Sequence, residues 1–168
     1  MHNILMKAYL KETTTDKFLE GIIIPAVKND MPLRKDGWQF NWKSLFKVDG
    51  ALFFKLCLVQ TPEHIEGMLM LTLINGEMMY MNNLEVAPHN YGSNGRFDRV
   101  AGCLLAFACW KSFELGRNNY LGFVAFDSKT NLIELYEKKY GATHAIGQKM
   151  FFDPVAGKNL MEAYLKVQ

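Results

Sequence analysis

The sequence has few of the features that would assign a chain to a well-marked class. Only three of 168 residues are cysteines, an odd number with no Cys-x-x-Cys pair. This count gives neither a disulfide framework nor a zinc site, and we expect buried free thiols in a reducing, cytoplasmic setting. The uncharged runs fall short of the ~18 residues that cross a bilayer. The first thirty residues also lack the apolar centre of a secretory signal.

A strong charge of either sign is also missing. The chain carries 19 basic and 17 acidic side chains, a net charge of +2. We therefore expect neither a nucleic-acid partner, which would need a basic face, nor an anionic membrane surface. Hydrophobic residues make up 49% and charged residues 21% of the chain, which excludes intrinsic disorder. The length fits a single domain over residues 1–168.

Several catalytic signatures are absent. The sequence contains no phosphate-binding Gly-x4-Gly-Lys loop, no Gly-x-Gly-x-x-Gly, no His-Glu-x-x-His and no Gly-x-Ser-x-Gly. The four histidines stand far apart at 2, 64, 89 and 144. We therefore expect no metal site.

The middle of the chain predicts three antiparallel strands over 51–59, 65–74 and 77–86. Asn75-Gly76 separates the last two apolar runs, and this pair is a strong hairpin signal because a type I′ turn needs positive φ at both central residues. The run 69–74 has little polar alternation, which indicates a strand covered on both faces.

Helices are expected on either side of these strands. An N-terminal helix is predicted over 14–27, because Phe18, Leu19, Ile22 and Ile23 share one helical face. A buried helix is predicted over 100–115, before Gly116. The later segments are predicted as a strand over 121–126, a helix from Ser128 or the capping-box sequence Asn131-x-x-Glu134 to Gly141, a strand over 150–152 and a helix over 160–167.

This order predicts an α/β chain of the α+β type, with a mixed, mostly antiparallel sheet and helices on both faces. The strands before and after the buried helix should be parallel neighbours. A crevice is expected where they part.

The start of the buried helix is a candidate anion site. Exposed N–H groups there attract negative charge, Arg96 and Arg99 add positive charge, and the small Ala101 and Gly102 permit close approach. The alternative interpretation is ordinary helix packing beside two surface arginines.

The layout resembles the GCN5-related N-acetyltransferase (GNAT) superfamily. Its signature, Arg/Gln-x-x-Gly-x-Gly/Ala after a Leu-x-Val-x-Pro strand, aligns with the segments 84–88 and 96–101. Arg96 and Ala101 match, whereas Arg99 stands in place of the central glycine, and the loop 88–96 is longer than usual. The resemblance covers residues 51–152. It implies an acetyl-coenzyme A N-acyltransferase fold whose loop and helix amides, around Val100 to Gly102, hold the pyrophosphate.

The resemblance also implies roles for individual side chains. Tyr136 matches the tyrosine that protonates the leaving thiolate, with Tyr140 as a nearby competitor. Lys129 stands where an Asn is frequent. Glu85 is the candidate base for the amine, its alternative being a surface or capping carboxylate. In the same strand, Leu84 and Val86 are expected to pack the pantetheine arm, and the backbone at Val86 to meet the thioester carbonyl.

The implied function is transfer of an acetyl group from acetyl-coenzyme A to a small-molecule or peptide amine by direct attack. Two alternatives stay open: a GNAT-like binding module, and transfer to another acceptor or of another acyl group, including charged aminoacyl-RNA as in toxin members. An aromatic acceptor pocket is expected from Trp38, Phe40, Trp42 and Phe151-Phe152. The aromatic content is also compatible with a homodimer surface.

Overall fold

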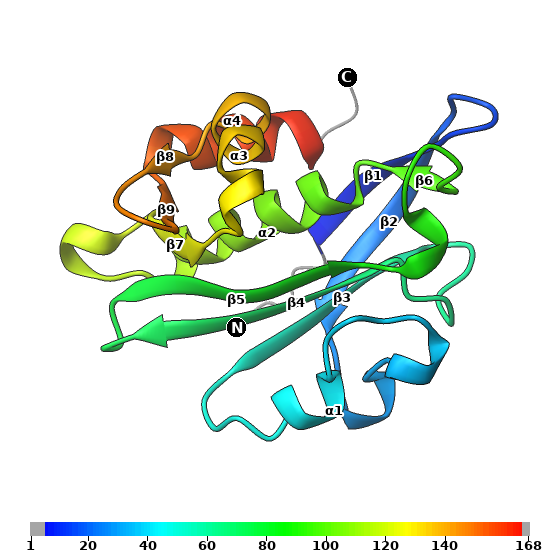
Figure 1. The fold of residues 1–168 in the computed structure, drawn as a ribbon, viewed down its shortest axis with the longest axis horizontal. Coiled ribbons are helices and arrows are strands. Elements are labelled where there is room, and N and C mark those ends of the chain that lie inside the picture. Colours follow the sequence, from blue (N-terminus) through cyan, green and yellow to red (C-terminus); the bar gives the residue numbers. More distant parts are fainter. Residues whose placement is uncertain (1–5, 166–168) are drawn as a thin grey trace.

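The computed structural model describes residues 6–165, and its strands form one nine-stranded sheet (Figure 1). The sheet order is β6-β1-β2-β3-β4-β5-β7-β9-β8, with β5 and β7 parallel and every other neighbouring pair antiparallel. The strands are β1 (Met6–Glu12), β2 (Phe18–Pro25), β3 (Leu52–Leu58), β4 (Gly67–Ile74), β5 (Met78–Val86), β6 (Phe97–Asp98), β7 (Val124–Asp127), β8 (Thr143–His144) and β9 (Lys149–Phe152). The predicted mixed, mostly antiparallel sheet is confirmed.

Helices cover both faces of this sheet. Three of them, α2 (Val100–Leu115), α3 (Ile133–Tyr140) and α4 (Pro154–Tyr164), lie on one face, and the short α1 (Trp42–Leu45) lies on the other (Figure 1). Each face has its own hydrophobic core: α2 packs on the larger one, and α1 with the segment 26–38 packs on the smaller one. No helix within residues 6–165 is long and apolar enough to cross a membrane.

The central meander follows the prediction. Strands β3, β4 and β5 pair in antiparallel order, and Asn75 and Gly76 have φ values of 53° and 71°, as a type I′ turn requires. The first five residues of β4 are buried, which agrees with a strand covered on both faces.

The predicted N-terminal helix is wrong. Residues 18–25 form β2, which pairs with β1 on one side and with β3 on the other. The β-branched run Ile22-Ile23-Ile24 suits a strand with two neighbours. Gly21 fits the same place, because a Cβ there would lie 3.1 Å from the Cys57 carbonyl oxygen on β3.

The other predicted helices are present, but some of them begin or end at different residues than predicted. Helix α2 ends before Gly116, and α3 ends at Gly141, which has a φ of 80°. The predicted capping box at Asn131 is not formed, because α3 begins at Ile133 without a side-chain cap. Helix α4 begins earlier than predicted, where the Asp153 side chain accepts a hydrogen bond from the Ala156 N–H at 2.8 Å. The predicted end of that helix, at residue 167, lies outside the described residues.

Candidate functional site

The parallel strands β5 and β7 separate soon after they meet. They pair at Met79 with Val124 and at Tyr80 with Ala125, and at no later residue of the described chain. Just beyond, β5 contains a bulge in which Asn82 is the extra residue opposite β4. Because a bulge bends its strand, β5 turns away from β7 and opens the predicted crevice.

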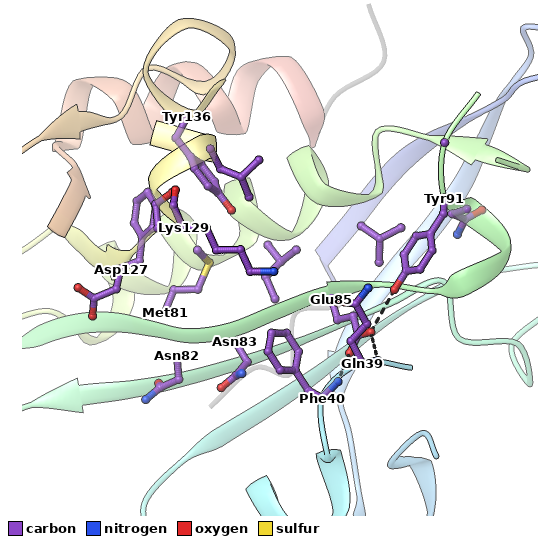
Figure 2. Close-up of a pocket in the computed structure, with 17 residues that line it drawn as sticks. Gln39, Phe40, Met81, Asn82, Asn83, Glu85, Tyr91, Asp127, Lys129 and Tyr136 are labelled. Carbon is purple, nitrogen blue, oxygen red and sulfur yellow. Dashed lines mark hydrogen bonds between the residues drawn. The ribbon is translucent and has the colours of Figure 1, made fainter. Parts of the chain in front are cut away.

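A cavity of about 540 Å³ occupies this crevice (Figure 2). It brings together five of the residues expected to bind the cofactor or to catalyse the reaction. These are Leu84, Glu85, Val86, Lys129 and Tyr136. Three segments far apart in the chain therefore meet here: β5, the loop after β7, and α3.

Tyr136 extends from α3 over the cavity (Figure 2). Its ring packs on Phe126 with 4.9 Å between centroids. Burial, and to a lesser degree the neighbouring Tyr140, raise the pKa of Tyr136 above its ordinary value of 10.0. The phenol therefore stays protonated at neutral pH. Tyr140 is buried and lines other cavities, beside α2 and α4.

Glu85 is 5% exposed and lines the cavity. Its carboxylate accepts hydrogen bonds from the N–H groups of Gln39 at 2.6 Å and Phe40 at 3.1 Å, from Trp42 Nε1 at 2.8 Å and from the Tyr91 hydroxyl at 3.1 Å. Glu85 thus holds the 39–42 segment in place, and Gln39 and Phe40 of this segment line the cavity.

A second cavity, of about 490 Å³, lies at the start of α2. Val100 and Ala101 line it, together with Lys11 from β1 and Lys139 from α3. The first turn of α2 has no side-chain cap, so its N–H groups are available to an anion. Val86 and Asn90 line both cavities. The two cavities therefore adjoin; together they extend from the start of α2 to Tyr136, and we call the pair the groove.

Arg99 lines this second cavity, but its guanidinium is engaged by the protein. It donates to the carbonyl oxygens of Tyr9 at 2.9 Å and Ala163 at 2.7 Å. It also lies over the rings of Phe18 and Tyr164, 5.2 and 4.7 Å from their centroids.

The other two residues predicted at the anion site lie differently. Arg96 is exposed and lies over the Phe97 ring, and it lines neither cavity. The space beside Gly102 holds the Tyr164 ring, because a Cβ on Gly102 would lie 2.1 Å from its Cε1. The close approach that this glycine permits is therefore used by a side chain of α4.

The expected aromatic acceptor pocket is wrong for the two tryptophans. Trp38 and Trp42 are 8% and 0% exposed, within the smaller core. Of the five residues expected to form the acceptor pocket, only Phe40 lines the groove; Phe151 and Phe152 do not.

The sequence did not point to several residues that line the groove. They are Lys11, Gln39, Asn82, Asn83, Tyr91, Asp127 and Lys139. Of these residues, only Tyr91 could have been suspected from the sequence, because it is polar, aromatic and close to the segment 96–101 that resembles the GNAT signature. Within residues 6–165, no group of three or more His, Cys, Asp or Glu side chains could hold a metal ion.

Sequence comparison finds no matching protein-family model and no matching curated protein. Comparison with solved structures finds several similar folds. A mutant of the toxin AtaT bound to the C-terminus of the antitoxin AtaR has a TM-score of 0.58 at 14% identity, over 83% of this chain and 97% of that one. The AtaTR complex bound with acetyl-coenzyme A has a TM-score of 0.56 at 12% identity, over 84% and 98%.

A third neighbour is the spermidine/spermine N-acetyltransferase SpeG from Vibrio cholerae, in mutant form. Its TM-score is 0.55 at 14% identity, over 83% of this chain and 98% of that one. These likenesses extend across almost the whole of each neighbour. The chain therefore has the fold of the GNAT acetyltransferases.

Proposed function

We propose that the protein is an N-acetyltransferase that takes its acetyl group from acetyl-coenzyme A. The observation that carries this proposal is the groove of two adjoining cavities, with an uncapped helix start at one end and Tyr136 at the other. Such a groove suits a long ligand with phosphates at one end and a thioester at the other. The shared fold supports the same conclusion.

The residues along the groove suit coenzyme A as co-substrate. At the phosphate end, Lys11, Lys139 and the first N–H groups of α2 offer positive charge. Leu84 and Val86 present apolar surface to a pantetheine arm. Among the described residues, β5 does not pair with β7 beyond Tyr80, so backbone groups on that edge can bond the amides and the thioester carbonyl.

The proposed reaction needs three proton and charge events. The amine nitrogen attacks the thioester carbon, and a backbone N–H near Val86 stabilises the oxyanion. The C–S bond then breaks, and the Tyr136 hydroxyl gives its proton to the leaving thiolate. The carboxylate of Glu85 takes the proton that an ammonium acceptor loses before attack and later passes it to water. The proton that the nitrogen loses after attack restores Tyr136.

Calorimetry with acetyl-coenzyme A tests the proposal first. We expect saturable binding by the folded protein, followed by release of free thiol and acetylated product when a panel of primary amines is added. No binding at millimolar acetyl-coenzyme A would overturn the proposal. Binding without transfer to any amine would favour the GNAT-like interaction module, which the engaged side chain of Arg99 also fits.

Tyr136→Phe should lower turnover with little change in acetyl-coenzyme A affinity, because the change removes a proton donor and keeps the ring on Phe126. General acid catalysis contributes about 100-fold or more. Tyr120→Phe is the matched control, since it removes an exposed tyrosine hydroxyl that lines neither cavity of the groove. Steady-state rates of thiol release measure both. Equal rates for Tyr136→Phe and the unchanged protein would remove Tyr136 from the mechanism.

A further inference from the structure

The carboxylate of Glu85 has no free acceptor position. Its Oε1 accepts from the Phe40 N–H and from Trp42 Nε1, and its Oε2 accepts from the Gln39 N–H and from the Tyr91 hydroxyl. Two donors per oxygen use the full capacity of a carboxylate. An amine in the groove can therefore bond Glu85 only by displacing one of these donors.

Three of the four donors belong to the protein interior or its backbone. Two are N–H groups of the 39–42 segment, and the third is the indole of Trp42, which is 0% exposed. The fourth donor differs, because Tyr91 is 41% exposed and lines the groove. Figure 2 shows its ring at the side of the groove with the hydroxyl directed at Glu85.

We propose that the Tyr91 hydroxyl is a catalytic group that carries the amine proton to Glu85. This proposal rests on the acetyl transfer proposed above. Before attack, the extra proton of the alkylammonium leaves its nitrogen for Tyr91 Oη, while the proton of Tyr91 moves along the existing 3.1 Å hydrogen bond to Glu85 Oε2. Tyr91 ends the step as a neutral phenol and Glu85 as a neutral acid. Glu85 later loses this proton to water through the same hydroxyl.

The surroundings of Tyr91 support a relay by a neutral phenol. Partial burial, followed by the charge of Glu85 and the hydrogen bond to it, raises the pKa of Tyr91 to about 12. The hydroxyl is therefore protonated at neutral pH and has a proton to pass on. The groove also holds Asp127, Lys129 and Tyr136, contributed by β7, the loop that follows it and α3.

The test compares Tyr91→Phe with Trp42→Phe. Both changes remove one donor to Glu85, but only Tyr91 faces the groove. Each variant is assayed with acetyl-coenzyme A and two kinds of acceptor: primary alkylamines, which are protonated at neutral pH, and O-methylhydroxylamine, which is neutral there. Thermal unfolding and calorimetric acetyl-coenzyme A binding establish that each variant is folded.

We expect Tyr91→Phe to lose about 100-fold or more in kcat with the alkylamines. The loss should be much smaller with O-methylhydroxylamine, which needs no proton removed before attack. Trp42→Phe should affect both acceptors equally.

Two results would overturn the relay. One is that kcat of Tyr91→Phe with the alkylamines stays within about twofold of the unchanged protein; the other is that kcat falls to the same extent with both acceptors. In either case Tyr91 carries no proton, and the proposed transferase activity still stands. An unchanged protein that acetylates neither acceptor would instead overturn the transferase proposal, and the relay with it.

Discussion

Arg99 occupies a backbone conformation that ordinarily belongs to glycine, with a φ of 80°. Glycine is also the residue that the GNAT signature has at this position. For an arginine this conformation is strained by about 1 kcal/mol. In return its guanidinium bonds carbonyl groups of β1 and α4, elements far apart in the sequence.

Arg99→Gly should therefore destabilise the protein, although it relieves the backbone. Two hydrogen bonds from a charged donor are lost, each contributing about 1.5–3 kcal/mol, against the ~1 kcal/mol regained. We expect a net loss of about 2–5 kcal/mol in the free energy of unfolding, measured by urea denaturation. Arg96→Ala is the control, since Arg96 is exposed and should change stability by less than ~0.5 kcal/mol. An equally stable Arg99→Gly would show that this guanidinium contributes no more than the ~1 kcal/mol of backbone strain that glycine relieves.

The Asp30–Lys55 pair should raise the free energy of unfolding at neutral pH and lose this effect in acid. Partial burial acts to raise the pKa of Asp30, but the hydrogen bonds and charge of Lys55 and the Val27 N–H lower it below its ordinary value of 3.8. A lowered folded-state pKa means that the pair stabilises the protein above pH 3.8 and less as the pH falls through the folded value. Lys55→Met should cost about 1–2 kcal/mol at pH 7.

The pH dependence is the check on this pair. The difference between Lys55→Met and the unchanged protein should shrink as urea unfolding is repeated at successively lower pH below 3.8. A difference that stays constant across this range would mean that packing of the lysine stem, rather than its charge, stabilises the fold.

At the scale of the elements, α2 and α4 can pack closely because Gly102 on α2 has no side chain. The Tyr164 ring fills the space beside Gly102. Gly102→Ala should push this ring away and cost about 1–3 kcal/mol. In a Tyr164→Ala background the same change should stabilise the helix by up to about 1 kcal/mol, because alanine is the better helix former. A double-mutant cycle by thermal unfolding measures this reversal. Additive effects would contradict the contact.

The sequence predicted elements best where local signals and packing agree. The hairpin at Asn75-Gly76 and the buried helix before Gly116 needed no long-range information. Strand β2 was mistaken for a helix because Phe18, Leu19, Ile22 and Ile23 also satisfy a helical period. What decides their conformation is pairing with β1 and β3, and that depends on residues up to about forty positions away.

The same distinction applies to the candidate site. Glu85 and Tyr136 lie in segments with clear signals, and the fold brings them to one cavity. The bonds of Glu85 to the 39–42 segment, and those of Arg99 to β1 and α4, join residues 43 to 90 positions apart. No local pattern encodes such contacts.

For the whole molecule, the groove joins β5, β7, α2 and α3, so a ligand that fills it should stabilise the entire fold. We expect coenzyme A to raise the unfolding temperature progressively with concentration, by the equivalent of about 2.7 kcal/mol at 100 times its Kd. Scanning calorimetry measures this, with adenosine as the control that lacks phosphates and pantetheine. An unfolding temperature that does not respond to coenzyme A would argue against a groove for this ligand.

The long loop between Pro88 and Arg96 is held at both ends. The Asn90 side chain bonds Glu66 and the Phe97 N–H. Thr13 bonds the loop's far end at Gly95, next to the pairing of β6 with β1. A ligand that meets this wall of the groove therefore spends little conformational entropy on ordering it. Affinity at this wall should depend on the contacts made rather than on a disorder-to-order transition.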